Sequence, residues 1–236
     1  MFKAPNRLFK RILHTKDLEK RRSGLITLSK KYQHQCYGLL AEAILAEEVN
    51  DSIELADAAV LRAHSDSEIL FSHFLLAEFI YTRLKTKPVD SRGIDYLIAE
   101  SLLKKAIRID PDYRYPKRQL ALFYSDWGRY DSFSEDEKRS VIYARKVFFE
   151  LYRKYKLPLY LDDYWICVQR NFSPSNALRA LHWALKKSPS NYNILYALGE
   201  SYEQIRNPEL AALYYKKAEE LGHPYLIKRP KLKSVK

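Results

Sequence analysis

The stretch from Ala197 to Pro224, ALGESYEQIRNPELAALYYKKAEELGHP, decides the fold. It contains two segments of helical periodicity that meet at Asn207-Pro208, a helix-capping residue followed by a proline suited to the first turn of a helix. With Tyr192 counted as position 1, large side chains fall at positions 4, 11 and 24 and small ones at positions 8, 20 and 27: Leu195, Tyr202 and Tyr215, then Gly199, Ala211 and Ala218. Small residues at such places let one helix approach its partner closely.

The same spacing recurs along the chain. A copy that starts at Pro158 has Leu161, Ala177, Leu181 and Ala184 in register, but Trp165 stands at position 8, where a small residue is expected. The first helix of that copy should therefore pack more loosely or at another angle. The pattern of the second helix appears again as Ala56, Val60 and Ala63, as Ala99, Leu103 and Ala106, and as Ala144, Phe148 and Leu151. Five units result, starting near Tyr37, Phe71, Arg114, Pro158 and Tyr192.

This pattern resembles the tetratricopeptide repeat (TPR), a helix-turn-helix unit of 34 residues. The resemblance implies an all-α fold, a right-handed α-solenoid of about five helix-turn-helix repeats with basic N- and C-terminal extensions. The alternative is an irregular helical bundle whose alanine spacing imitates a repeat. The predicted organisation is a basic amphipathic segment over residues 1–31, the solenoid over 32–225 and a basic tail over 226–236.

Charge is concentrated at the two ends of the chain. The formal net charge is +12. Residues 1–31 hold ten Lys or Arg and two acids, a net +8, and residues 226–236 hold five basic residues and no acid, which leaves −1 for residues 32–225. This distribution indicates a neutral body with cationic ends and argues against a uniformly basic surface.

No motif for catalysis, phosphate binding or metal binding is present. The six glycines are scattered, and the six histidines share no metal-ligand spacing. Cys36 and Cys167 form no CxxC pair, which favours a reducing intracellular compartment, mitochondrial or cytoplasmic. The longest apolar run, residues 69–81, is too short to cross a bilayer. The sequence therefore predicts a protein that is not an enzyme and has no cofactor, metal or small-molecule substrate.

The resemblance also implies a partner-binding groove, because the first helices of TPR units line the inner surface of the solenoid. Positions 5 and 9 of each unit tend to face that groove. The predicted groove residues are Leu45, Leu75, Phe79, Arg118, Leu122, Asp162, Ile166, Tyr196 and Glu200. Such a lining should prefer an amphipathic helix or an apolar peptide. Two alternatives remain: these side chains belong to the core, or the N-terminal helix of the chain fills the groove.

The basic ends carry the second set of candidate contacts. Residues 2–14 form a segregated helical wheel typical of a mitochondrial targeting helix, of a helix on an anionic membrane or of a helix that docks on a protein. The C-terminal tail resembles the cationic extensions of ribosomal proteins. Candidate contacts to RNA or an anionic surface are Lys3, Arg7, Lys10, Arg11, Arg21, Arg22, Lys228, Arg229, Lys231 and Lys233.

Two functions fit these features. The first is a scaffold or adaptor that binds proteins through its inner helical face and joins a larger assembly through its basic ends. The alternative is a structural subunit of a ribosome or organellar ribosome, with both ends in contact with RNA.

Overall fold

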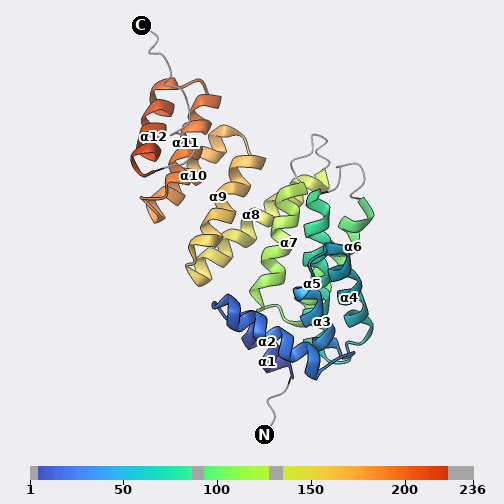
Figure 1. Cartoon of the computed structure of the whole chain (residues 1–236). Coiled ribbons are helices and arrows are strands. Elements are labelled where there is room, and N and C mark those ends of the chain that lie inside the picture. The colour runs from blue at the N-terminus through green and yellow to red at the C-terminus, as the bar shows by residue number, and fades with distance from the viewer. Residues whose placement is uncertain (1–4, 87–92, 128–134, 223–236) are drawn as a thin grey trace. The chain divides into compact units, whose positions relative to one another are not determined.

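Helices joined by short turns and loops make up the described part of the chain (Figure 1). The structure is a computed structural model that describes residues 5–86, 93–127 and 135–222. Within these ranges the chain forms twelve helices and no strand, which confirms the predicted all-α helical-repeat fold. The helices are α1 (Pro5–Leu13), α2 (Leu18–Lys31), α3 (Cys36–Leu45), α4 (Val49–Leu61), α5 (Asp66–Thr86), α6 (Gly93–Ile109), α7 (Arg114–Trp127), α8 (Glu135–Tyr155), α9 (Pro158–Asn171), α10 (Pro174–Lys187), α11 (Tyr192–Gln204) and α12 (Pro208–Glu220).

The helices alternate as the repeat predicts. The first helices of the five predicted units are α3, α5, α7, α9 and α11, and each is followed by its second helix, α4, α6, α8, α10 or α12. Four of the five predicted starts agree with the observed ones to within one residue, whereas α5 begins at Asp66, five residues before Phe71. The chain divides into two compact units, residues 1–123 and 124–236, called the N-terminal and the C-terminal unit below.

Small residues lie where the helices pack. The alanines predicted for the second helices are buried, with at most 4% of their surface exposed: Ala56, Ala99, Ala106, Ala144, Ala177, Ala184, Ala211 and Ala218. Ala63 is the exception, because α4 ends at Leu61 and Ala63 follows it in the loop. The alanine spacing therefore reports real helix contacts.

The irregular position in the fourth unit is filled by a core side chain. Trp165 is buried in a cluster with Leu161, Leu181 and Leu198, and its indole N–H donates a hydrogen bond to Asp162 Oδ1 at 3.0 Å. A ring at this position holds the two helices of the unit apart. Accordingly, α9 packs less extensively on α10 than α11 does on α12, as the departure from the repeat predicts.

The N-terminal helices belong to the N-terminal unit. Phe9 of α1 is fully buried, and its ring lies 5.2 Å from that of Tyr37 and 5.5 Å from that of Phe71, measured between centroids. Leu25 and Leu28 of α2 are buried where α2 packs on α3. These contacts place α1 against the beginnings of two successive first helices, α3 and α5.

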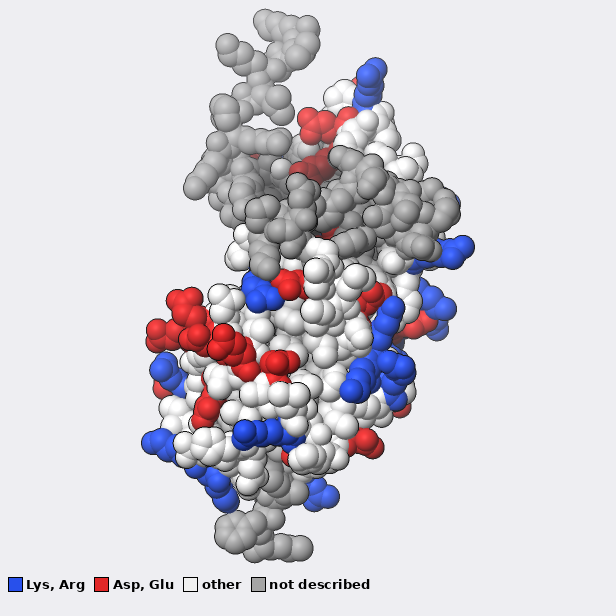
Figure 2. All heavy atoms as spheres, turned by 90° about the vertical axis from the view of Figure 1, so that its right-hand side faces the viewer, with Lys and Arg blue, Asp and Glu red and all other residues white. Residues whose placement is uncertain are grey.

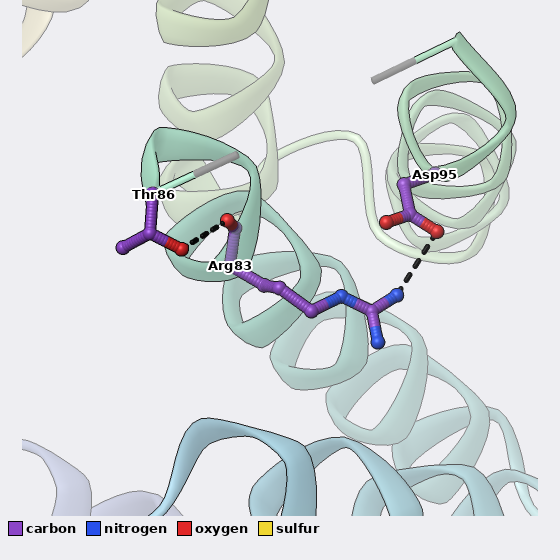
Figure 3. A network of polar contacts seen from close by, with 3 residues as sticks. All are labelled: Arg83, Thr86 and Asp95. Atoms are coloured by element: carbon purple, nitrogen blue, oxygen red, sulfur yellow. Dashed lines mark hydrogen bonds and ion pairs between the residues drawn. The ribbon is translucent and has the colours of Figure 1, made fainter. Parts of the chain in front are cut away.

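A polar bridge joins α5 to α6 (Figure 3). A guanidinium N–H of Arg83 donates to Asp95 Oδ1 at 2.9 Å, and the hydroxyl of Thr86 donates to the Arg83 carbonyl oxygen at 2.8 Å. The side chains of Arg83 and Asp95 are only 25% and 16% exposed. Loss of either partner would leave a poorly hydrated charge behind, so this ion pair helps to hold the two helices of the second repeat, α5 and α6, together.

Candidate functional site

The two thiols and the imidazole of His73 are buried. Burial raises the pKa of the Cys36 thiol to about 12, and burial raises that of Cys167 to about 11, so both remain protonated at neutral pH. His73 is buried, and its Nδ1–H donates to the Ile69 carbonyl oxygen at 2.7 Å. No group of three or more His, Cys, Asp or Glu side chains in the described ranges is placed to hold a metal ion.

None of the helices in the described part of the chain is both long enough and apolar enough to cross a bilayer.

The predicted groove residues of the N-terminal unit differ in exposure. Leu45, Phe79, Arg118 and Leu122 are half-buried on α3, α5 and α7. Leu75, in contrast, is buried, with 6% of its surface exposed, because α5 is surrounded along its middle turns. Leu75 therefore belongs to the core and offers little surface to a partner.

Arg118 lies in a charged cluster around Glu78. Burial raises the pKa of the Glu78 carboxyl group, and three nearby cations on α7, α2 and α5 oppose that rise: Arg118, Arg21 and Lys85. Two candidate residues, one from the predicted groove and one from the predicted basic surface, thus act electrostatically on the same carboxyl group. Part of the positive charge of Arg118 and Arg21 is therefore balanced by Glu78 within the N-terminal unit.

The predicted groove residues of the C-terminal unit lie on two first helices that contact each other, α9 and α11. Asp162, Ile166, Tyr196 and Glu200 are all half-buried. Asp162 Oδ1 also accepts from Asn191 Nδ2 at 3.1 Å, and Glu200 Oε2 accepts from Gln169 Nε2 at 2.7 Å. Both carboxylates are therefore held in fixed positions beside the two apolar side chains.

Most of the N-terminal basic candidates within the described residues are exposed, on α1 and α2. Arg7, Lys10, Arg11 and Arg22 are exposed, whereas Arg21 is half-buried. Lys10 Nζ lies 5.6 Å from the ring centroid of Tyr113, and the His14 ring stacks on Tyr115 with 5.4 Å between centroids. Phe9 and Ile12 on the apolar face of α1 are buried, so this face meets a bilayer or a targeting receptor only if α1 leaves its place.

The remaining basic candidates are not placed by the structure. Lys3, Lys228, Arg229, Lys231 and Lys233 lie outside the described residues.

Charge is uneven within the body of the chain. Residues 42–61 carry six acids and no Lys or Arg, whereas residues 141–187 carry nine Lys or Arg against three acids, a net +6. Figure 2 shows the side of the N-terminal unit where α4 lies, with acidic side chains gathered in one group. The neutral sum for residues 32–225 therefore hides an acidic segment around α4 and a basic one from α8 to α10.

A pocket opens on the basic segment of the C-terminal unit. It has a volume of about 460 Å³ and is lined by α8, α9 and α10. The lining side chains are Arg145, Phe149, Tyr164, Val168, Asn176, Arg179, Ala180 and Trp183. The lining contains two arginines and three aromatic rings but no carboxylate.

Comparison with known proteins identifies the fold but not the family. No protein-family model matches the chain, and no curated protein matches its sequence. Among solved structures it resembles TTC0263, a thermophilic TPR protein of Thermus thermophilus, at 18% identity over 89% of this chain and 97% of that one, with a TM-score of 0.55. YrrB, described as a TPR protein with an unusual peptide-binding site, matches at 14% identity over 95% and 96% of the two chains, with a TM-score of 0.54.

This chain has a TPR-like fold. A third similar structure, MamA of MSR-1, matches at 15% identity over 78% of this chain and 91% of that one, with a TM-score of 0.55. The TPR-like register places the predicted groove residues on first helices. The pocket instead has two of its three walls on second helices, α8 and α10.

The sequence contains a signal for this pocket that the groove prediction did not use. Arginine is followed four residues later by an aromatic residue on both second helices, as Arg145 and Phe149 and as Arg179 and Trp183. Residues four apart share one face of a helix. A repeated pair of this kind predicts two similar faces on neighbouring second helices.

Proposed function

We propose that the chain is a non-enzymatic TPR-like scaffold or adaptor subunit that binds a protein partner through the inner face of its first helices. Its basic ends would anchor it to a larger assembly. One observation carries this proposal: on α9 and α11, two fixed carboxylates lie with two half-buried apolar side chains at the positions that face the groove in TPR units.

The exposure of these side chains suits a peptide ligand. Ile166 and Tyr196 retain apolar surface that a partner would remove from water, and burial of apolar surface supplies most of the affinity of such grooves. Asp162 and Glu200 already accept hydrogen bonds, but a carboxylate has further acceptor sites. The partner is therefore expected to be an amphipathic helix or apolar peptide that carries Lys or Arg at one edge.

The test is affinity purification of the native chain in parallel with two variants, Leu122→Glu and Glu200→Lys. Leu122→Glu places a charge on the half-buried face of α7, and Glu200→Lys reverses a charge on α11. A partner lost from a variant whose circular dichroism and melting curve match the wild type supports the proposal. Leu213→Glu, on an exposed site of α12, is the control that should retain the partner.

A second function, contact with RNA through the basic ends, is favoured by the exposed cations of α1. Arg7, Lys10 and Arg11 all reach solvent. Nuclease treatment before purification separates the two functions, because an RNA-bound assembly dissociates and a protein partner stays. Deletion of residues 226–236 together with Arg7→Ala, Lys10→Ala and Arg11→Ala should abolish salt-sensitive RNA binding if the ends carry it.

A further inference from the structure

The pocket between α8, α9 and α10 has a cationic end and an aromatic end. Phe149, Tyr164 and Trp183 form a closed triangle, with ring centroids 5.2 to 5.8 Å apart. Arg145 and Arg179 each stand one helical turn before an aromatic member of that triangle, on facing walls. Val168, one turn along α9 from Tyr164, also lines the pocket.

The two guanidinium groups are available to a ligand. Arg145 and Arg179 are both exposed, and within the described residues neither forms an ion pair with a carboxylate. Arg179 donates to Asn176 Oδ1 at 2.6 Å, and the Arg145 guanidinium carbon lies 4.9 Å from the ring centroid of Phe172. Each contact orients the guanidinium group but leaves N–H donors free, since an arginine has five.

This arrangement selects ligands by charge and by shape. Guanidinium groups bind carboxylates in paired hydrogen bonds, and an adjacent apolar cup gains affinity from a buried ring or aliphatic side chain. We propose that the pocket binds an acidic peptide segment of a partner protein, with an aromatic side chain in the cup formed by Phe149, Tyr164 and Trp183 and a carboxylate held by Arg145 and Arg179.

The ring geometry suits an amino-acid side chain. The planes of the three rings are inclined to one another by 48° to 71°, and a further aromatic side chain packs on inclined rings in edge-to-face or offset geometry. Any one ring face also accepts a stacked base, so the test includes oligouridine. The site is also separate from the groove on α9 and α11, because Asp162, Ile166, Tyr196 and Glu200 do not line it.

The experiment measures binding of a fluorescently labelled peptide, Ser-Asp-Glu-Phe-Glu-Asp-Ser, to the full chain by anisotropy. Arg145→Ala and Arg179→Ala should each weaken binding at least about tenfold, because each removes a charge-assisted hydrogen-bonding group. Lys146→Ala and Lys186→Ala are matched controls. They remove one positive charge each from exposed sites on α8 and α10 outside the pocket lining, and should change the affinity less than about twofold.

Two further ligands complete the test. A peptide with Phe replaced by Ala should bind at least about tenfold more weakly, which tests the aromatic cup without altering the protein. Labelled oligouridine should bind with equal affinity to the Arg145 variant and the Lys146 variant, as expected of contact through net charge alone.

The proposal is overturned if wild-type protein does not bind the acidic peptide. Equal losses of peptide affinity in the arginine variants and the lysine controls also overturn it, since they would show that the peptide is attracted by net charge and not bound at the pocket. If oligouridine binds more tightly than the peptide and depends on Arg145 and Arg179, the pocket is a nucleic-acid site instead. The groove variant Glu200→Lys should leave peptide binding unchanged, so failure of this inference and failure of the proposed function are distinguishable.

Discussion

Gly199 of α11 lies directly against the aromatic ring of Tyr215 of α12. A Cβ atom built on Gly199 would stand 2.5 Å from two ring carbons of Tyr215, closer than any real contact allows. These residues occupy positions 8 and 24 of the last unit, where the repeat pairs a small residue with a large one. The pair therefore shows in one contact why the spacing recurs: the missing side chain of the first helix makes room for a ring on the second.

Gly199→Ala is expected to destabilise the C-terminal unit. The added methyl group overpacks the helix contact, which lowers the free energy of unfolding by about 1–3 kcal/mol. The better helix propensity of alanine offsets about 1 kcal/mol of this loss. The measurement is the free energy of unfolding from urea titration followed by circular dichroism.

Gly93→Ala provides the control for this substitution. A Cβ atom at Gly93 meets nothing within 4 Å, so the variant should be neutral or slightly more stable. Equal stability of the two variants would contradict the packing explanation. Addition of Tyr215→Ala to Gly199→Ala should remove much of the clash, which a double-mutant cycle measures.

The helix caps give a second matched pair. Asn207 Oδ1 accepts a hydrogen bond from the Leu210 backbone N–H at 3.1 Å, whereas Ser173, at the same place before α10, makes no side-chain cap bond. Asn207→Ala should therefore lower the free energy of unfolding by about 1 kcal/mol, and Ser173→Ala by clearly less. Thermal and urea unfolding of both variants measures the difference. Similar losses in the two variants would show that the side-chain cap bond of Asn207 does not account for its contribution to stability.

The architecture was predictable because helix packing leaves a periodic record. Ala177, Ala184, Ala211 and Ala218 are buried where two helices approach closely, and only a small side chain fits there. Their regular spacing in the sequence therefore indicates where helices pack on each other. The Trp165 departure was also readable as looser packing, although its hydrogen bond to Asp162 depends on a rotamer that no sequence spacing encodes. Repeat spacing thus predicts backbone approach better than it predicts side-chain partners.

The candidate sites were less predictable, because they depend on what covers each face. Leu75 has the same repeat position as Tyr196, yet only Leu75 is buried. In the net charge of residues 32–225, an acidic segment likewise cancels a basic one. This sum therefore gave no indication of the basic segment that contains Arg145 and Arg179. Position in a repeat assigns a side chain to a face, but the neighbouring helices determine whether that face is open.

The docking of α1 can be tested through Phe9. Its ring is fully buried against Tyr37 and Phe71, and loss of a buried Phe side chain costs about 3–5 kcal/mol. In Phe9→Ala, amide hydrogen exchange in α1 should become much faster, while exchange in α11 stays as in the wild type. Arg11→Ala, an exposed change on the same helix, should leave the exchange of α1 unaltered. Unchanged protection of α1 in Phe9→Ala would contradict the docking seen here.

The two thiols should react only when the chain unfolds. Burial raises the pKa of Cys167 to about 11, so at pH 8 only about one molecule in a thousand carries that thiolate, and the fraction for Cys36, with a pKa of about 12, is smaller. Ellman's reagent at pH 8 should therefore label neither cysteine in the native protein and both in urea. Rapid labelling of the folded chain would show that one of these thiols is accessible and ionised.

His73 predicts how stability depends on pH near neutrality. Burial, with a smaller effect of Lys105, lowers the pKa of His73 below its ordinary value of 6.5, although the bond to the Ile69 carbonyl opposes the shift. As the pH falls below 6.5, the unfolded chain takes up a proton at this residue before the folded chain does, so the free energy of unfolding decreases, by at most about 1.4 kcal/mol per pH unit. Above 6.5 both states are neutral and the contribution is complete. In His73→Gln the decrease between pH 7.5 and 5.5 should be smaller than in the wild type, as measured by urea unfolding at each pH.

His14 and His182, whose pKa values burial also lowers, remain in the variant and contribute a residual slope of the same sign. A decrease of equal size in both proteins would mean that His73 titrates alike in the folded and unfolded states, and that burial does not keep its ring neutral.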